Sequence, residues 1–264
     1  MIKSPVKFIG WCALLLLSML VLPAGAQTPP PANFERISAD LSSQEKEERL
    51  SALIAMRGIA RELGAGDRDA VAARCGDILR SDPSPVVRAA AAGVLEEIGT
   101  PTSSAQLVES LPRQKEVNVR KAIAYALAGH KDTESLDILR TLLRDRKAEV
   151  RGAAAWAIAQ RNETSLSDDL IRYLRKYRKD EDAFGRSMAV RALGAHPEAR
   201  DLLLRILSGD KHDIVLISAA SALARIAAPG DAEVVEALKV AALSRNPYLA
   251  SQSNAALDQL RTRP

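Results

Sequence analysis

The chain has 264 residues, which is enough for one large domain or for an extended array of repeated units. It is rich in alanine, with 27% charged and only 3% aromatic residues, and this composition suits an array of helices. The net charge is +4 and falls to +2 without the N-terminal Lys3 and Lys7, so charge gives no argument for a nucleic-acid partner.

Residues 1–26 have the three parts of a secretory signal peptide. Lys3 and Lys7 form the positively charged start, residues 8–22 form the apolar core, and small residues at 24–26 form a cleavage site before Gln27. The apolar core is shorter than the ~20 residues that a membrane-spanning helix needs, which favours cleavage over an uncleaved anchor. We therefore expect a periplasmic or secreted protein that involves the membrane only if this segment stays in place.

The segment after the cleavage site is rich in proline, and we expect residues 27–40 to be a flexible spacer before a helical domain at 41–264. Serines and acids at 42–48 are typical of a helix start. Glycines at 64 and 66 separate this helix from the next one, and similar Gly or Pro turns follow to the C-terminus. The pattern predicts about thirteen helices in about six pairs, and no strand.

One segment recurs along most of the chain. Residues 147–160, KAEVRGAAAWAIAQ, have copies in which apolar positions follow helical spacing and are mostly alanine, the best helix former. With Arg151 as the reference position, the copies follow each other at intervals of 30 to 35 residues, which is typical of a solenoid of stacked helical pairs. The reference positions are Arg88, Arg120, Arg151, Arg186, Leu216 and Ala250.

An aspartate stands six residues before the reference position in several copies. In the turn before a helix, an aspartate can cap that helix by accepting backbone N–H groups, and it can also bond the arginine of a neighbouring repeat. We therefore expect Asp145 and Asp180 to cap their helices and to link neighbouring repeats through Arg151 and Arg186. The residues of this predicted inter-repeat ladder are Asp82, Arg88, Asp145, Arg151, Asp180 and Arg186.

The resulting pattern, D-x-x-x-x-V-R-x-x-A-x-x-A-L, resembles the second half of a HEAT repeat, and the short period is similar to the lyase-type HEAT-like variety. The resemblance extends from about Gln44 to the C-terminus. Gln114 and Ser244 depart from the aspartate, and Leu216 and Ala250 depart from the arginine. The resemblance implies an all-α fold, a right-handed α–α superhelix of about six helical pairs with the repeated helix on its concave side.

Catalytic and metal-binding patterns do not occur in the sequence. His130, His196 and His212 lie at helix ends or turns, where we expect capping or solvated groups, and none precedes the glutamate of the iron-binding His-Glu pairs in HEAT-like deoxyhypusine hydroxylases. No cysteine–histidine cluster has zinc spacing, and no phosphate-binding loop or nucleophile motif is present. Cys75, the one cysteine left after cleavage, has the helical setting of a buried thiol. We expect no metal, no cofactor and no catalysis.

The fifth residue after the reference position points away from the packed faces of the repeated helix. In three consecutive repeats this position holds Tyr125, Trp156 and Arg191, residue types that are enriched in interface hot spots. Two interpretations fit this row: it binds a protein partner, or its aromatic rings cover gaps between alanine-rich helices.

A basic stripe is the second candidate site. Arg172, Arg175, Lys176 and Lys179 recur at helical spacing on one face. Either they bind an anionic headgroup, polysaccharide or acidic protein, or they are solvated cations at a helix C-terminus, where the helix dipole favours them.

Stacked helical pairs present long surfaces, and such surfaces usually hold other macromolecules. The sequence therefore predicts a periplasmic or secreted, non-enzymatic HEAT-like scaffold that binds a protein through its concave face. The alternatives are an enzyme or enzyme subunit of the lyase-type HEAT-like group, and a module that binds an anion or a surface. The sequence predicts neither the identity of the partner nor an oligomeric state.

Overall fold

The computed structural model describes residues 30–178 and 182–262, and over these residues it forms fourteen α-helices and no strand. The predicted signal peptide at 1–26, and Lys179 and Asp180 of the predicted sites, lie outside the described residues. None of the described helices is long and apolar enough to cross a membrane.

The α-helices alternate between two layers. The odd-numbered helices are α1 (Phe34–Asp40), α3 (Ala65–Ser81), α5 (Pro101–Ser110), α7 (Thr133–Leu142), α9 (Ser167–Lys176), α11 (Arg200–Gly209) and α13 (Ala232–Ala242). The even-numbered helices are α2 (Lys46–Ile59), α4 (Pro85–Ile98), α6 (Val117–Ala126), α8 (Ala148–Arg161), α10 (Ala183–Ala192), α12 (Asp213–Ile226) and α14 (Pro247–Thr262). Short 3-10 helices are η1 (Ala60–Glu62), η2 (Leu111–Arg113), η3 (Leu127–Gly129), η4 (Leu193–Ala195) and η5 (Pro197–Ala199).

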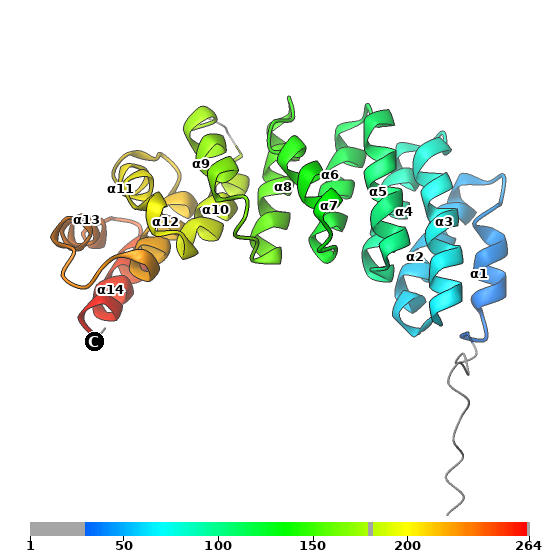
Figure 1. Cartoon of the computed structure of the whole chain (residues 1–264), viewed down its shortest axis with the longest axis horizontal. Helices are drawn as coiled ribbons and strands as arrows, with labels where there is room; N and C mark the ends of the chain where they lie inside the picture. The colour runs from blue at the N-terminus through cyan, green and yellow to red at the C-terminus, as the bar shows by residue number, and fades with distance from the viewer. Residues whose placement is uncertain (1–29, 179–181, 263–264) are drawn as a thin grey trace, which may run out of the picture.

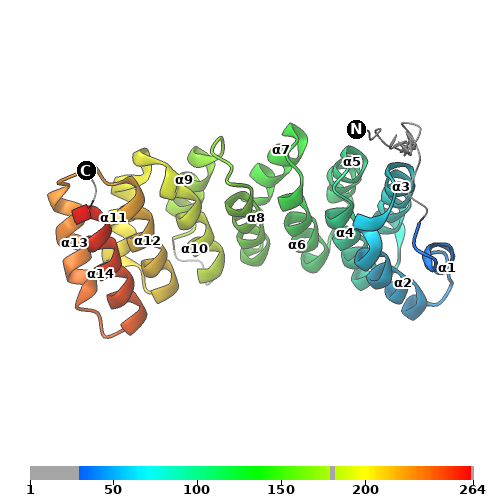
Figure 2. The same ribbon diagram turned by 90° about the horizontal axis from the view of Figure 1, so that it is seen from below.

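The helices stack into an arch (Figure 1). Each even-numbered helix packs against the next even-numbered one, from α2 to α14, and Figure 2 shows this row on the inner side of the arch. The odd-numbered helices cover the outer side, where neighbours such as α3 and α5 also contact each other. The all-α solenoid expected from the repeat is therefore confirmed.

Small side chains let the inner helices approach closely, and α8 is the clearest case. Ten of its fourteen residues are buried, because α6, α7 and α10 all pack against it. Where α8 crosses α10, a Cβ added to Gly185 would lie 2.2 Å from the Cα of Gly152. The alanine-rich sequence thus favours the helix and permits the short interhelical distance at the same time.

The chemistry of the turns sets where the helices begin and end. Thr100, Asp132, Asp182 and Asp231 are N-caps of α5, α7, α10 and α13, and each side chain accepts a backbone N–H three residues later. Helix α4 ends at Gly99, whose φ of 63° is a left-handed conformation that glycine adopts without a steric penalty. These ends keep the connections short, so that consecutive helices remain neighbours in space.

The expected division of the chain is wrong at the N-terminal boundary. Residues 34–40, expected to belong to a flexible spacer, form helix α1. Phe34, Ile37 and Leu41 lie at helical spacing and are buried in the core, because α1 packs against α2. The solenoid therefore begins before residue 41, and the described chain has seven helix pairs instead of about six.

Candidate partner-binding surface

Ion pairs join successive repeats along one edge of the arch. In each pair an arginine of one inner helix bonds an aspartate in the turn before the next inner helix. These aspartates stand six residues before the reference position of their own repeat. The pairs are Arg49–Asp82 at 2.6 Å, Arg120–Asp145 at 2.7 Å and Arg186–Asp210.

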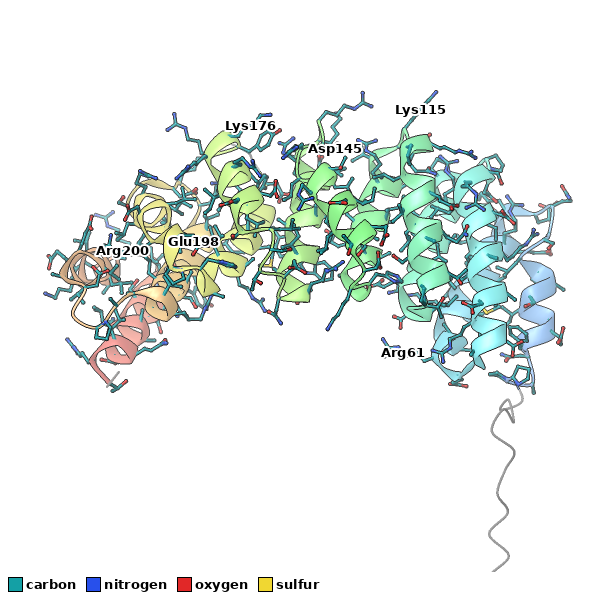
Figure 3. The ribbon with its side chains drawn as sticks, in the orientation of Figure 1. Arg61, Lys115, Asp145, Lys176, Glu198 and Arg200 are labelled. Carbon is teal, nitrogen blue, oxygen red and sulfur yellow. The ribbon has the colours of Figure 1, made fainter. Side chains whose placement is uncertain are left out.

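The partners of Asp145 differ from those predicted. Its carboxylate bonds Arg120 of the preceding repeat and accepts the N–H of Lys147 at 2.8 Å. Lys147 is itself the N-cap of α8, so Asp145 stabilises the turn before the helix and does not cap the helix. Arg151 instead donates to the backbone carbonyl of Asp145 at 2.6 Å. Figure 3 shows Asp145 at the edge of the arch from which Lys115 projects.

The predicted ladder also differs at its other positions. Arg88 donates to Gln114 at 3.1 Å and to Glu116 at 2.6 Å, because glutamine replaces the aspartate in that repeat. Asp180 lies outside the described residues, and the N-cap of α10 is Asp182, which accepts a backbone N–H at 2.9 Å.

Arg49 belongs to the ladder although the sequence analysis did not identify it. Its guanidinium bonds Asp82 and also donates to the carbonyls of Ser43 and Gln44, both at 2.9 Å. The spacing in the sequence could have identified Arg49, because it follows Ser43 by the same six residues that separate Arg151 from Asp145. No aspartate marks the start of this first repeat.

The predicted aromatic row lies near the middle of the inner surface. Tyr125 of α6 and Trp156 of α8 pack edge to face, with ring centroids 5.1 Å apart and ring planes at 81°. Both side chains rest against the buried core and stay partly exposed, while Arg191 of α10 is exposed. An edge-to-face pair contributes about 0.5–1.5 kcal/mol beyond the area it buries. The rings therefore close the gap between two helices and still offer a surface to a ligand.

Charged groups lie at both ends of α10, the helix next to α8. Burial raises the pKa of Tyr125, and the negative charge of Asp182 raises it further. At the C-terminal end of α10, Arg225 of α12 donates to the backbone carbonyls of Arg191 and Gly194 at 3.1 and 3.2 Å. The two arginines line a small pocket of about 230 Å³ between the ends of α8 and α10. Sequence reasoning missed Arg225 because only the packing of α12 beside α10 brings it there.

The described residues of the predicted basic stripe lie on one helix, α9, but have different surroundings. Arg172 bonds the buried carboxylate of Asp169 at 2.7 Å. Lys176 lies over an aromatic ring, with its nitrogen 5.0 Å from the ring centroid, and projects from the edge of the arch in Figure 3. Arg175 is exposed and lines a groove on the outer surface. Lys179 lies outside the described residues.

Two of the three turn histidines are buried and not solvated. His130 is 4% exposed and His196 is 7% exposed, since the turns that hold them pack between repeats. Burial lowers the pKa of His130 and favours its neutral form. In the described part of the chain, no group of three or more histidine, cysteine or acidic side chains is placed to hold a metal ion.

Known proteins share this architecture. The family described as "HEAT repeats" matches residues 110–194, from the end of α5 to η4. The fold is a HEAT-like solenoid. No curated protein matches the chain.

Solved structures agree with this fold. The HEAT-like solenoid is similar to the YibA protein of Escherichia coli, with a TM-score of 0.63 and 21% identity over 87% of this chain and 81% of that one. It is also similar to the complex of CpcE and CpcF of phycocyanin lyase from Nostoc, with a TM-score of 0.51 and 20% identity over 89% and 97%. An engineered protein gives a TM-score of 0.56 and 22% identity over 89% and 69%. At these identities the likeness concerns the fold.

Proposed function

We propose that this HEAT-like solenoid is an exported scaffold that binds another protein through the inner surface of its arch, and that it is not an enzyme. The inner helices form one continuous row, and helical repeat proteins use such extended surfaces for binding. Among the structures that share the fold, CpcE is found in a complex with CpcF. Assembly with a protein partner is thus compatible with this architecture.

The observation that carries the proposal is the partly exposed Tyr125–Trp156 pair beside Arg191. Several other inner helices have a small residue at the equivalent position, which in α4 is Gly93. Rings that are already packed against each other lose little conformational freedom when a partner binds. With Arg191 and Arg225 nearby, the surface favours a partner segment that carries an apolar side chain and a carboxylate.

The binding test compares two aromatic substitutions. The partner is captured from the envelope fraction with the wild-type chain, identified by mass spectrometry and titrated against each variant. Trp156→Ala should weaken binding by ~2 kcal/mol or more while thermal unfolding stays cooperative. Tyr248, which is 75% exposed at the start of α14, is the matched control, and Tyr248→Ala should leave the affinity unchanged.

Two results would contradict the proposed binding surface. One is an unchanged affinity in Trp156→Ala, and the other is a loss of cooperative unfolding in that variant, which would make Trp156 a structural residue. Turnover of a substrate by the purified chain alone would contradict the non-enzymatic part of the proposal. It would favour the lyase-type alternative.

Export is proposed from residues 1–26, whose order of charge, apolar core and small residues is typical of a cleaved leader. Protein recovered from the periplasm or the medium should begin at Gln27 when its N-terminus is sequenced. A recovered chain that begins at Met1 would contradict cleavage.

A further inference from the structure

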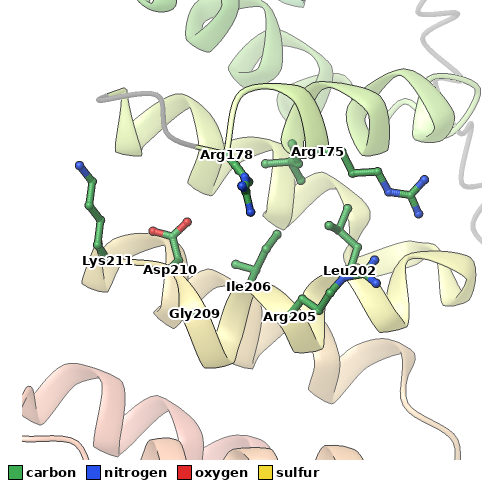
Figure 4. Close-up of a pocket in the computed structure, with 9 residues that line it drawn as sticks. Arg175, Arg178, Leu202, Arg205, Ile206, Gly209, Asp210 and Lys211 are labelled. Carbon is green, nitrogen blue, oxygen red and sulfur yellow. The ribbon is translucent and has the colours of Figure 1, made fainter.

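A groove of about 1140 Å³ opens on the outer surface of the arch between α9 and α11 (Figure 4). These two helices make few direct contacts with each other. Instead, α9 contacts η4 and α11 contacts η5, and η4 and η5 pack together. The link between the two outer helices therefore runs through these 3-10 turns, and the groove lies beside the C-terminal end of α9.

The floor of the groove is apolar. Leu174 of α9 lines it from one side, and Leu202 and Ile206 of α11 point toward α9 from the other (Figure 4). Leu174 and Leu202 are only 3% and 7% exposed, so the floor is recessed. A ligand that reaches this floor must carry a narrow apolar group.

The rim of the groove is basic on both sides. Arg175 and Arg178 come from the end of α9 and the turn after it, and Arg205 and Lys211 come from α11 and the turn after it. All four side chains are exposed, and none of them forms an ion pair with an acid among the residues that the structure describes. The sequence separates the two pairs by about 30 residues, so only the packing of α9 and α11 makes them one site.

Three arginines on the nearby outer helices, Arg140 of α7, Arg172 of α9 and Arg200 of α11, are paired with acids, unlike the cations of the rim. The carboxylate of Asp169 forms ion pairs with Arg140, Arg144 and Arg172. Arg200, at the start of α11, contacts three different acids. The four rim cations therefore differ from these paired arginines of the same region.

The acid in the lining does not neutralise the rim. Asp210 pairs with the buried Arg186 and accepts the N–H of His212 at 3.0 Å. Arg186 also donates to the carbonyl of Arg178 at 3.3 Å, so its guanidinium connects the turn after α9 with Asp210 at the end of α11. The two helix C-termini add about half a negative charge each, which is less than the four cations supply.

We propose that this groove binds an extended acidic peptide segment of a partner protein. Successive side chains of an extended chain point in opposite directions, so apolar ones can reach the floor while carboxylates meet the long cations of the rim. A flat membrane fits less well, because the apolar floor is recessed and none of the exposed large hydrophobic residues lines the groove. A nucleic-acid strand also fits less well, because no aromatic side chain lines it for base stacking. The site is separate from the Tyr125–Trp156 surface and does not depend on it.

The experiment measures the fluorescence anisotropy of a labelled peptide, in which glutamate alternates with leucine, as the full chain is added. Saturable binding that weakens with added salt is expected. Reversing one cation from each side, in Arg178→Glu with Arg205→Glu, should weaken the affinity about tenfold or more, because each change replaces attraction with repulsion. The matched control reverses two exposed arginines in turns that do not line the groove, Arg113→Glu with Arg146→Glu, and should change the affinity by less than about twofold.

The apolar floor is tested with a second peptide, in which serine replaces leucine. This peptide should bind about tenfold more weakly, because it has no side chain to bury on the floor. Equal binding of the two peptides would overturn the proposal, since the groove would then be a general anion site. Equal weakening in the groove and control variants, or binding of phosphatidylglycerol vesicles without binding of the peptide, would also overturn it.

Discussion

Polar residues at the ends of helices have surroundings that other helices of the solenoid provide. Arg161 is 9% exposed, and its guanidinium donates to the carbonyl of Leu127 at 3.2 Å and to the hydroxyl of Ser135 at 2.7 Å. Leu127 follows α6 of the preceding repeat, whereas Ser135 lies in α7 of the same helix pair as Arg161, so a buried cation joins two repeats through neutral oxygens. Burial lowers its pKa, which shows that the protein environment disfavours the charge. Removing Arg161 would leave these buried acceptors without this donor, which costs free energy.

The buried thiol of Cys75 should be unreactive in the folded protein. Burial raises the pKa of Cys75 to about 12, so almost no thiolate exists near neutral pH and the sulfur is also inaccessible. In the chain without residues 1–26, Ellman's reagent should label no thiol in buffer and one thiol in denaturant. Equally fast labelling under both conditions would contradict this burial.

His130 should make the protein less stable as the pH falls. Burial lowers its pKa below the ordinary value of 6.5, while Asp132 raises it and Arg161 lowers it to a smaller extent. The unfolded chain therefore binds a proton at a pH where the folded chain does not. Stability falls as the pH drops below about 6.5 and continues to fall until the folded-state pKa is reached.

The check on His130 is chemical unfolding at several pH values between about 6.5 and 5. His130→Gln removes the titrating group, so the free energy of unfolding of this variant should fall less with pH than that of the wild type. Parallel pH profiles for the two proteins would show that His130 does not carry the effect.

At the level of elements, the crossing of α8 and α10 depends on residues without side chains. A Cβ on Gly152 would lie 1.7 Å from Oδ2 of Asp182 and 3.1 Å from the Cα of Gly185. The Asp182 carboxylate cannot move freely, since it caps α10. The close approach of the two helices and the cap therefore need a glycine at the same place.

Gly152→Ala should destabilise the protein by about 1–3 kcal/mol, because the added methyl group forces α8 and α10 apart. The control is Gly58→Ala in α2, where an added Cβ meets nothing within 4 Å. There the better helix propensity of alanine should stabilise by about 0.5 kcal/mol. Urea unfolding measures both, and a stabilising effect of Gly152→Ala would contradict the close contact.

On the scale of the whole molecule, the arginine–aspartate pairs connect repeats that otherwise contact only their neighbours. In a solenoid, stability is close to a sum of repeat and interface contributions. The Arg120–Asp145 pair is part of one such interface, and its side chains are 8% and 12% exposed. Removing one partner from a pair that is this well buried should cost more stability than removing one from the exposed pairs of the outer helices.

Asp145→Ala should destabilise the protein by about 2–4 kcal/mol, because it leaves the buried Arg120 without its carboxylate. Asp137 is the matched control: its carboxylate is 63% exposed and pairs with Arg140 within the same helix. Asp137→Ala should lower the free energy of unfolding by no more than about 0.5 kcal/mol. If the two variants unfold at the same denaturant concentration, the ladder does not stabilise the arch.

Helical periodicity made most of the fold predictable. Contacts along a helix are local, and the repeat presents the same local pattern every 30 to 35 residues, so the inner helices and their alanine-rich faces follow from the sequence. The row of Tyr125, Trp156 and Arg191 was found in the same way, because equivalent positions of stacked repeats must lie side by side. Helix α1 was missed because it is short and follows a proline-rich segment, and its burial depends on α2.

The sequence by itself therefore determined the all-α solenoid, its period and the position of the aromatic row, because each depends on spacing within or between equivalent helices. The tertiary structure alone decided that Asp145 pairs with Arg120 and not with Arg151, since that choice depends on how far one repeat is displaced from the next. It also decided that Arg178 and Arg205 face a common groove. The groove lies between α9 and α11, which make few direct contacts, and such an irregularity in packing has no counterpart in the repeated pattern of the sequence.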